Sequence, residues 1–313
     1  MVKRIFLKIH YYLDIRKALK SLSFVLENGR YYIEGNKLYR CEPDSSHHKH
    51  IFKIRSKDKY LVVLKEGVFK ITPYKYLLLN NDMVFTVVRG NKRYAHIRGK
   101  LDSYLDKIPY KTMACKFIDK YSLIVSDVVV GNQHDDDAHL QQFIDYYFKH
   151  LDLSHIERKK VDMSSKVEEV IFYPQHGDCY CKNIFWRNGE PILIDLDDVD
   201  LYPLFYDIFY HVIASKHEEA FTFFRNAKFQ GIINSFFADK INETKCDIID
   251  LYLGAYVYFW VNRMERKMTH HEIYFYLQWF EKANLSAFPT VMNAIEQYRR
   301  NLKLLGIKDE KRK

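Results

Sequence analysis

Residues 176–198, HGDCYCKNIFWRNGEPILIDLDD, gather acidic and amide side chains next to an apolar run. Asp178 is followed five residues later by Asn183, and the apolar residues 191–194 lead directly into Asp195. Carboxylate and amide oxygens are the hard ligands that Mg²⁺ prefers, and a carboxylate can also accept or orient a hydroxyl proton. These residue types are suited to metal-assisted chemistry on a hydroxyl group.

A turn signal between these residues indicates how they come together. The sequence Arg187-Asn188-Gly189-Glu190 contains Asn-Gly, which favours a tight β-hairpin. A closed hairpin would bring Asp178, Asn183 and Asp195 around one pocket. Phosphoryl transfer from ATP needs this set, because one carboxylate orients the acceptor hydroxyl while an Asn oxygen and a second carboxylate hold Mg²⁺.

The pattern HGDxxxxN followed by ILIDLDD resembles the catalytic segment of the aminoglycoside phosphotransferase and choline kinase group, usually written HGDLHPGN…IDWDD. That group is similar in fold to the protein kinases, whose HRDxxxxN loop has the same spacing. The resemblance implies that Asp178 is the catalytic carboxylate and that Asn183 and Asp195 are metal ligands. It further implies that His176 braces the loop, that Asp207 steadies it from a helix start, and that ATP and Mg²⁺ are the cofactors.

The resemblance is tight over residues 176–211 and architectural elsewhere. Tyr180-Cys181-Lys182 stands where the group has His-Pro-Gly. For the lysine that binds the ATP phosphates we prefer Lys65, in YLVVLKEG, over Lys70, in VFKIT. Its usual Glu partner has no evident counterpart, and Asp102 is one candidate replacement.

Other interpretations of the acidic cluster are weaker. A calcium-binding loop starting at Asp195 fails, because its sixth position is Asp200 instead of Gly and its twelfth is Tyr206 instead of Glu. A zinc site from His176, Cys179 and Cys181 has ligand pairs too close for common finger spacing. For Asp197, a second metal contact and a solvated turn are equally open.

The elements around the cluster indicate an α+β protein with a two-lobed, protein-kinase-like fold. Residues 30–100 hold short β-prone runs separated by turn signals, which predicts an antiparallel sheet. The chain after residue 200 reads as helical, notably 247–268, 271–284 and 289–305. We therefore expect an N-terminal sheet lobe at 1–126, with the nucleotide site, and a mainly helical catalytic lobe at 127–313.

Two helices have specific predicted features. Apolar residues recur at helical spacing after the aspartates 135–137, which suit a helix N-terminus; the face is Leu140, Phe143, Ile144, Tyr147, Phe148 and Leu151. In the helix 247–268, Tyr252, Tyr256 and Trp260 could line an acceptor pocket, although packing in the core is the favoured interpretation.

Composition limits the classes of partner. The chain has 313 residues, a net charge of +9 and no apolar stretch of the roughly 20 residues that a membrane span needs. Residues 1–27 read as a basic amphipathic helix, so peripheral contact with an anionic membrane is an open alternative to packing on its own domain. The absence of a secretory signal and the five scattered cysteines favour a cytoplasmic protein with reduced thiols.

The sequence therefore predicts an ATP-dependent phosphotransferase. It would move the γ-phosphate to a hydroxyl of a small molecule or sugar, with a cell-surface glycan precursor among the candidates. The alternative is a catalytically inactive kinase-like binding module, which the unusual loop at Tyr180-Cys181-Lys182 motivates. Nucleic acid is not an expected partner, because no basic, aromatic-interleaved motif appears, and the oligomeric state is left open.

Overall fold

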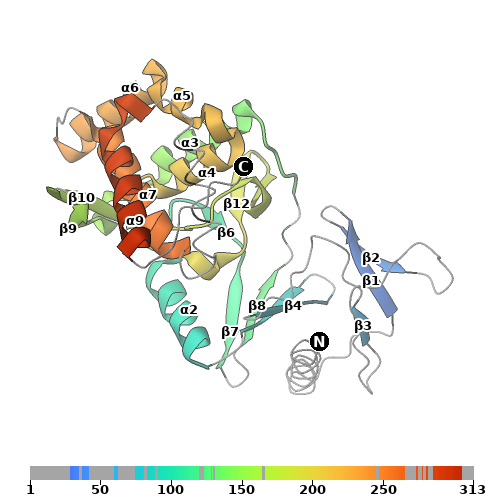
Figure 1. The fold of residues 1–313 in the computed structure, drawn as a ribbon. Coiled ribbons are helices and arrows are strands. Elements are labelled where there is room, and N and C mark those ends of the chain that lie inside the picture. The colour runs from blue at the N-terminus through green and yellow to red at the C-terminus, as the bar shows by residue number, and fades with distance from the viewer. Residues whose placement is uncertain are drawn as a thin grey trace, which may run out of the picture. The chain divides into compact units, whose positions relative to one another are not determined.

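The fold was analysed in a computed structural model of the full chain (Figure 1). The structure describes residues 29–34, 37–41, 60–62, 75–80, 83–88, 91–119, 123–127, 129, 131–163, 166–243, 247–264, 273, 277, 280 and 285–304. The chain divides into two compact units, each discontinuous in sequence. The first comprises Met1–Asp102, Lys111–Asn132 and Phe185–Ile194, and the second comprises Ser103–Tyr110, Gln133–Ile184 and Asp195–Lys313.

The first unit contains an antiparallel four-stranded sheet in the order β4-β5-β8-β7. Its strands are β4 (Lys75–Asn80), β5 (Met83–Val88), β7 (Cys115–Ile118) and β8 (Leu123–Asp127). A separate sheet has the order β2-β1-β3, formed by β1 (Gly29–Glu34), β2 (Lys37–Cys41) and β3 (Tyr60–Val62). Strand β1 pairs antiparallel with β2 and parallel with β3.

The predicted Asn-Gly hairpin is present. Strands β11 (Ile184–Arg187) and β12 (Glu190–Leu193) are neighbours in one sheet, and β12 also pairs parallel with β6 (Lys111–Thr112). Asn188 and Gly189, the two residues of the turn, both have positive φ, at 54° and 76°. That backbone is the one a type I′ turn needs, which is why Asn-Gly predicted it.

Helices make up most of the second unit. They are α3 (Asp137–His150), α4 (Tyr206–Lys216), α5 (Ala220–Arg225), α6 (Ala227–Phe236), a π-helical turn (Phe237–Ile241), α7 (Ile248–Met264) and α9 (Pro289–Leu304). Short 3₁₀ turns lie at Leu153–His155, Cys181–Asn183, Leu196–Asp198, His217–Glu219 and Leu285–Ala287. Among the described residues, no helix is both long and apolar enough to cross a bilayer.

A three-stranded sheet in the second unit has the order β13-β10-β9. Strands β9 (Glu157–Met163) and β10 (Lys166–Gln175) form an antiparallel pair, and β13 (Asp200–Pro203) runs antiparallel to the other edge of β10. β10 is the central strand, and its C-terminal residues Phe172–Gln175 pair with Asp200–Pro203 of β13. The segment that starts at His176 therefore leaves a rigid support.

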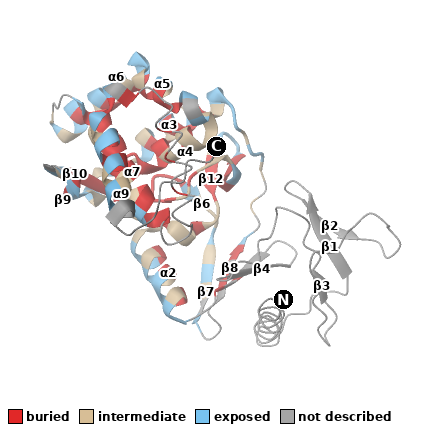
Figure 2. Ribbon diagram, viewed as in Figure 1, coloured by how far each residue is buried: buried red, intermediate tan, exposed pale blue. Residues whose placement is uncertain are grey.

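Aromatic side chains fill the core of the second unit, where Figure 2 shows buried residues concentrated on α3, α4 and α7. The largest fully buried side chains are all aromatic: Tyr147, Tyr173, Tyr206, Tyr256, Phe143, Phe205, Phe209, Phe224 and Phe237. Buried tyrosines need partners for their hydroxyls. The Tyr147 hydroxyl accepts from the Phe205 amide, and the Tyr252 hydroxyl accepts from the Ile171 amide.

The helix after the aspartates forms as predicted. Asp136 is the N-cap of α3, and its side chain accepts a hydrogen bond from the backbone N–H of His139. The buried residues of α3 are Leu140, Phe143, Ile144 and Tyr147, which belong to the predicted face. A capping carboxylate that satisfies a free N–H explains why this helix begins where it does.

Three details of the expected organisation were wrong. The region 30–100 was expected to be sheet, but α2 (Asn91–Tyr104) begins within it, with Tyr94, Ile97 and Leu101 buried at helical spacing. The chain after residue 200 was expected to be helical, but β13 opens it because Leu201–Pro203 pair with β10. The β9–β10 hairpin was not predicted at all.

Several predictions lie outside the described residues. They are the basic helix at 1–27, Lys65, Lys70 and most of the helix expected at 271–284. The lobe boundary at residues 126/127 stays a prediction. The α+β composition of the fold is confirmed.

Candidate functional site

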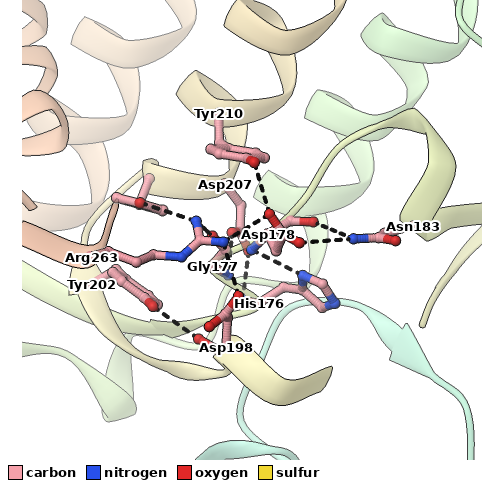
Figure 3. Close-up of polar contacts among 10 residues, drawn as sticks. His176, Gly177, Asp178, Asn183, Asp198, Tyr202, Asp207, Tyr210 and Arg263 are labelled. Carbon is pink, nitrogen blue, oxygen red and sulfur yellow. Dashed lines mark hydrogen bonds and ion pairs between the residues drawn. The ribbon is translucent and has the colours of Figure 1, made fainter. Parts of the chain in front are cut away.

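The segment that leaves β10 is held from outside by Asp207, the second residue of α4 (Figure 3). The two Asp207 carboxylate oxygens each accept one backbone N–H, from His176 and from Gly177, both at 2.8 Å. The Asp207 amide in turn donates to the side-chain oxygen of Gln175 at 3.0 Å. Asp207 is fully buried, and it steadies the loop from a helix start, as the resemblance implied.

Gly177 is required because two parts of the second unit approach each other closely. Its φ is 80°, in the left-handed region that favours glycine. A Cβ atom on Gly177 would lie 2.6 Å from the carbonyl oxygen of Asp198 and 2.6 Å from the ring of Tyr202. The loop after β10 and the turn after β12 are therefore in direct contact.

Asp178 lies at the centre of a hydrogen-bond network (Figure 3). One carboxylate oxygen, Oδ1, accepts from the hydroxyl of Tyr210 at 2.7 Å and from Nη2 of Arg263 at 2.8 Å. The other oxygen, Oδ2, accepts from the Asn183 amide at 3.3 Å. The Asp178 backbone N–H donates to Nδ1 of His176 at 3.2 Å, so His176 braces the loop.

These contacts set the charge of Asp178. Burial raises the pKa of its carboxyl, but the charge of Arg263 and hydrogen bonds from Arg263 and Tyr210 outweigh burial, and the pKa is lowered from its usual value. The group is therefore an anion at neutral pH. Burial and the nearby Asp178 carboxylate raise the pKa of Tyr210, which keeps its hydroxyl protonated as a donor. The side chain of Asp178 is 22% exposed, so one part of it can meet a substrate.

Arg263, near the end of α7, holds two acidic groups at once. Its Nη2 lies 2.8 Å from Asp178 Oδ1 and 2.9 Å from Asp198 Oδ2, and its Nη1 donates to the Gly177 carbonyl. The guanidinium also lies over the ring of Tyr210, 5.3 Å from its centroid. Burial lowers the pKa of Arg263, but Tyr206, Asp198 and Asp178 outweigh it, and the pKa is raised well above its usual value.

Asn183 is positioned to offer its oxygen to a cation. It ends the 3₁₀ turn Cys181–Asn183, and its backbone N–H donates to the Tyr180 carbonyl at 2.8 Å. Its side-chain amide nitrogen donates to the Asp178 carbonyl at 2.9 Å and to Asp178 Oδ2. In Figure 3 the amide oxygen points away from Asp178. The nitrogen thus fixes the side chain, which is 6% exposed, while the oxygen, a hard ligand, is directed away from Asp178.

Asp195 reaches its position through an unusual backbone. It follows β12 and precedes the 3₁₀ turn Leu196–Asp198, with φ 59° and ψ 61°. Asp is among the few residues besides glycine that adopt this left-handed conformation with some frequency. Strain of this kind is often found at functional sites, so the conformation is consistent with the metal-binding role predicted for Asp195.

Tyr180 connects the two acidic positions. Burial raises the pKa of its hydroxyl, and the negative charges of Asp178 and Asp195 raise it further. Both carboxylates therefore act on one phenol. The donor set of Asp195 and Asn183, a carboxylate and an amide oxygen, fits a hard divalent cation such as Mg²⁺.

The structure joins Asp178 and Asn183 directly, and it places Asp195 in the same unit with its charge acting on Tyr180. Asp102 forms an ion pair with Arg98, four residues earlier in α2. The metal-ligand and catalytic roles themselves stay predictions. Sequence reasoning missed Arg263, Tyr210 and Asp198, for which only the acidic run at 195–198 gave any signal.

The competing interpretations gain no support from the described residues. Cys179 is fully buried and burial raises the pKa of its thiol, which opposes the thiolate form that zinc requires. Tyr252, Tyr256 and Trp260 are buried in the core, at 3%, 1% and 7% exposure, as the favoured interpretation expected.

Comparison with known proteins gives one family match. Residues 133–235 match the model of the phosphotransferase enzyme family, a segment that carries Asp178, Asn183, Asp195 and Asp207. A search of the curated proteins finds no match to this chain.

Two solved structures are similar to this chain. One is an amicoumacin kinase in complex with AMP-PNP, Ca²⁺ and Ami (12% identity, TM-score 0.37, 69% of this chain and 86% of that chain covered). The other is a choline/ethanolamine kinase family protein from Mesorhizobium loti (8% identity, TM-score 0.41, 74% of this chain and 93% of that chain covered). Both TM-scores are below 0.5, so the class of this protein is inferred from the family match and the site residues and not from these two structures.

The site carries the residue types that a kinase-type phosphotransferase needs, and it lies in an α+β fold. Residues 133–235 of the 313 match the phosphotransferase enzyme family, and this match supports an ATP-dependent small-molecule kinase. The match agrees with the predicted phosphotransferase class.

Proposed function

We propose that this kinase transfers the γ-phosphate of ATP to a hydroxyl group of a small molecule or sugar, with Asp178 contacting the acceptor. The observation that carries the proposal is the Asp178–Asn183 pair. Asp178 is ionised and partly exposed, and Asn183 fixes its own side chain on Asp178 with its amide oxygen directed away from that carboxylate. A carboxylate for the hydroxyl thus lies next to an oxygen ligand for the metal.

Asn183 and Asp195 would hold Mg²⁺, and the bound ion would neutralise the phosphate charge during transfer. In the reaction, the acceptor oxygen forms a bond to the γ-phosphorus while the bond from that phosphorus to the bridging oxygen of ADP breaks. The acceptor proton leaves toward the Asp178 carboxylate. Because its pKa is lowered, Asp178 is a weak base, and its main contribution is to orient the hydroxyl.

Asp207 contributes indirectly by fixing the backbone from His176 to Asp178. Both of its oxygens are occupied by backbone N–H groups, so it contacts no substrate. A fixed backbone keeps the Asp178 carboxylate in one position. Such preorganisation lowers the barrier because no ordering is required at the moment of reaction.

The acceptor class is the open part of this proposal. Amino alcohols, aminoglycosides and nucleotide- or lipid-linked sugars all offer hydroxyls of suitable chemistry. A net charge of +9 favours anionic partners, and a cytoplasmic enzyme that docks peripherally on an anionic membrane would meet a glycan acceptor there. The family does not decide among these classes, because fold does not fix substrate.

An acceptor screen tests the proposal. ATP consumption would be measured with Mg²⁺ against these acceptor classes for the wild type, for Asp178→Asn and for Asp195→Ala. We expect at least one acceptor to stimulate ADP release by the wild type only. Wild-type protein that binds Mg·ATP but phosphorylates no acceptor would contradict the proposal.

A further inference from the structure

We propose that Arg263 is a positioning residue for phosphate transfer, which holds the Asp178 carboxylate in the orientation that receives the acceptor hydroxyl. The inference rests on the proposed function. Arg263 lies 85 residues after Asp178 in the sequence, on a different element, and reaches it with Nη2 at 2.8 Å. Its side chain is only 8% exposed, so water screens the pair little.

The contacts distinguish the two oxygens of Asp178. Oδ1 receives both strong donors, the Arg263 guanidinium at 2.8 Å and the Tyr210 hydroxyl at 2.7 Å. Among the described residues, Oδ2 receives the Asn183 amide alone, at the longer distance of 3.3 Å. Arg263 and Tyr210 therefore anchor Oδ1, and Oδ2 is the atom that meets the acceptor hydroxyl.

Arg263 also joins the loop of Asp178 to the turn of Asp198. Its Nη2 bridges the two carboxylates, and its Nη1 binds the carbonyl of Gly177, the residue before Asp178. The backbone at Gly177 already lies against the Asp198 carbonyl. The guanidinium adds side-chain contacts between the same two segments. One cation thus fixes both the direction of the catalytic carboxylate and the distance between the loop and the turn.

An arginine is needed here for its shape as well as its charge. The planar guanidinium presents several N–H donors in a fixed arrangement, whereas a lysine ammonium is a compact charge on a flexible stem. Arg263 uses two nitrogens for acceptors on Gly177, Asp178 and Asp198, and Nη1 also donates to the Tyr206 hydroxyl at 3.5 Å. Its plane also covers Tyr210, the second donor to Oδ1, which orders that ring.

The test is a double-mutant cycle between Arg263→Met and Asp178→Asn, measured with Mg·ATP and the acceptor found in the screen. We expect Arg263→Met to lower kcat by about 10²-fold while the KM for ATP changes by about threefold or less. Adding Arg263→Met to Asp178→Asn should cost less than about threefold more, because the arginine acts through the missing carboxylate. Arg263→Lys should retain about a tenth of wild-type kcat, since it keeps the charge without the fork.

Two comparisons guard against a trivial loss of folding. Arg263→Lys keeps a cation between Asp178 and Asp198. It replaces Arg263→Met in the double-mutant cycle with Asp178→Asn if Arg263→Met does not fold. Arg300→Met removes an arginine that is 75% exposed on α9 and should leave kcat unchanged. If the kcat losses of the two single variants multiply in the double variant, or if Arg263→Met weakens ATP binding as much as it lowers kcat, the proposed role of Arg263 is wrong. The proposed function would then still stand. A wild type that phosphorylates no acceptor would instead overturn the proposed function and this role together.

Discussion

Two acidic segments meet in the second unit, and they are positioned in different ways. The loop His176–Asn183 is held by side chains from other elements: Asp207 fixes its backbone, and Arg263 and Tyr210 fix the Asp178 carboxylate. In the turn after β12, Asp195 is placed by its own left-handed backbone at the end of a strand. The turn is then tied to the loop through Asp198 and Arg263.

The difference is informative about function. A carboxylate that orients a hydroxyl must have a defined direction, which several donors at one oxygen supply. A carboxylate that binds a metal can instead be placed by its own backbone. The contacts of the loop are thus compatible with the hydroxyl-orienting role proposed for Asp178, and the backbone of the turn is compatible with the ligand role proposed for Asp195. Four substitutions test this distinction.

The largest effect is expected for Asp195→Ala. If Asp195 is a metal ligand, ATP should raise the Tm of the wild type appreciably only with Mg²⁺ or Mn²⁺, and Asp195→Ala should lose that metal-dependent part entirely. At ligand concentrations of 100 Kd the lost stabilisation is about 2.7 kcal/mol. Thermal unfolding with and without metal measures it, with Asp197→Ala as the neighbouring comparison. An unchanged metal response in Asp195→Ala would remove this residue from the site.

Asp178→Asn should affect catalysis and spare binding. The amide keeps the shape of the side chain but cannot take a proton, so kcat should fall by about 10²-fold or more. Mg·ATP should raise the Tm of this variant as it does in the wild type, because Asp178 contacts the acceptor and not the metal. Steady-state kinetics with the identified acceptor provide the measurement. Equal turnover by the variant would mean that Asp178 is only a loop residue.

Asp207→Asn should weaken the loop as a structural unit. The new NH₂ group faces a backbone N–H where an oxygen accepted one, which leaves a buried donor unpaired at a cost of about 1–3 kcal/mol. Chemical denaturation measures the loss. Asp145→Asn on α3, an exposed position, is the matched control and should change stability by less than about 0.5 kcal/mol. Equal stability of both variants would contradict the anchoring role of Asp207.

The smallest effect is expected for Tyr210→Phe. It removes the hydroxyl that donates to Asp178 Oδ1 and retains the ring beneath Arg263. A hydrogen bond to a charged group contributes about 1.5–3 kcal/mol, but Arg263 still holds the same oxygen, so kcat should fall by only about tenfold. Measuring kcat of Tyr210→Phe and of Arg263→Lys under the same conditions would show which side chain contributes more to holding the Asp178 carboxylate. A loss larger than that of Arg263→Lys would make the tyrosine the principal anchor of the carboxylate.

Sequence reasoning succeeded where short-range forces decide the structure. The Asn188-Gly189 turn follows from the backbone that those two residues tolerate, and the start of α3 follows from a carboxylate that caps the helix. Both effects act between residues that are close in the sequence, so the local sequence pattern is enough to predict them. The β9–β10 hairpin was missed because its polar, charged sequence lacks a clear alternation, and its pairing with β13 joins segments that are distant in the sequence.

The sequence by itself predicted the chemistry, through the spacing of Asp178, Asn183 and Asp195 in a segment that matches the phosphotransferase enzyme family. Only the tertiary structure decided how Asp178 is held, because Arg263 lies far along the chain in a helix whose sequence is apolar on nearly every side. Nothing in that helix marks this arginine as different from a surface charge. Its partners are chosen by how α7 packs against the loop, and packing depends on the whole core.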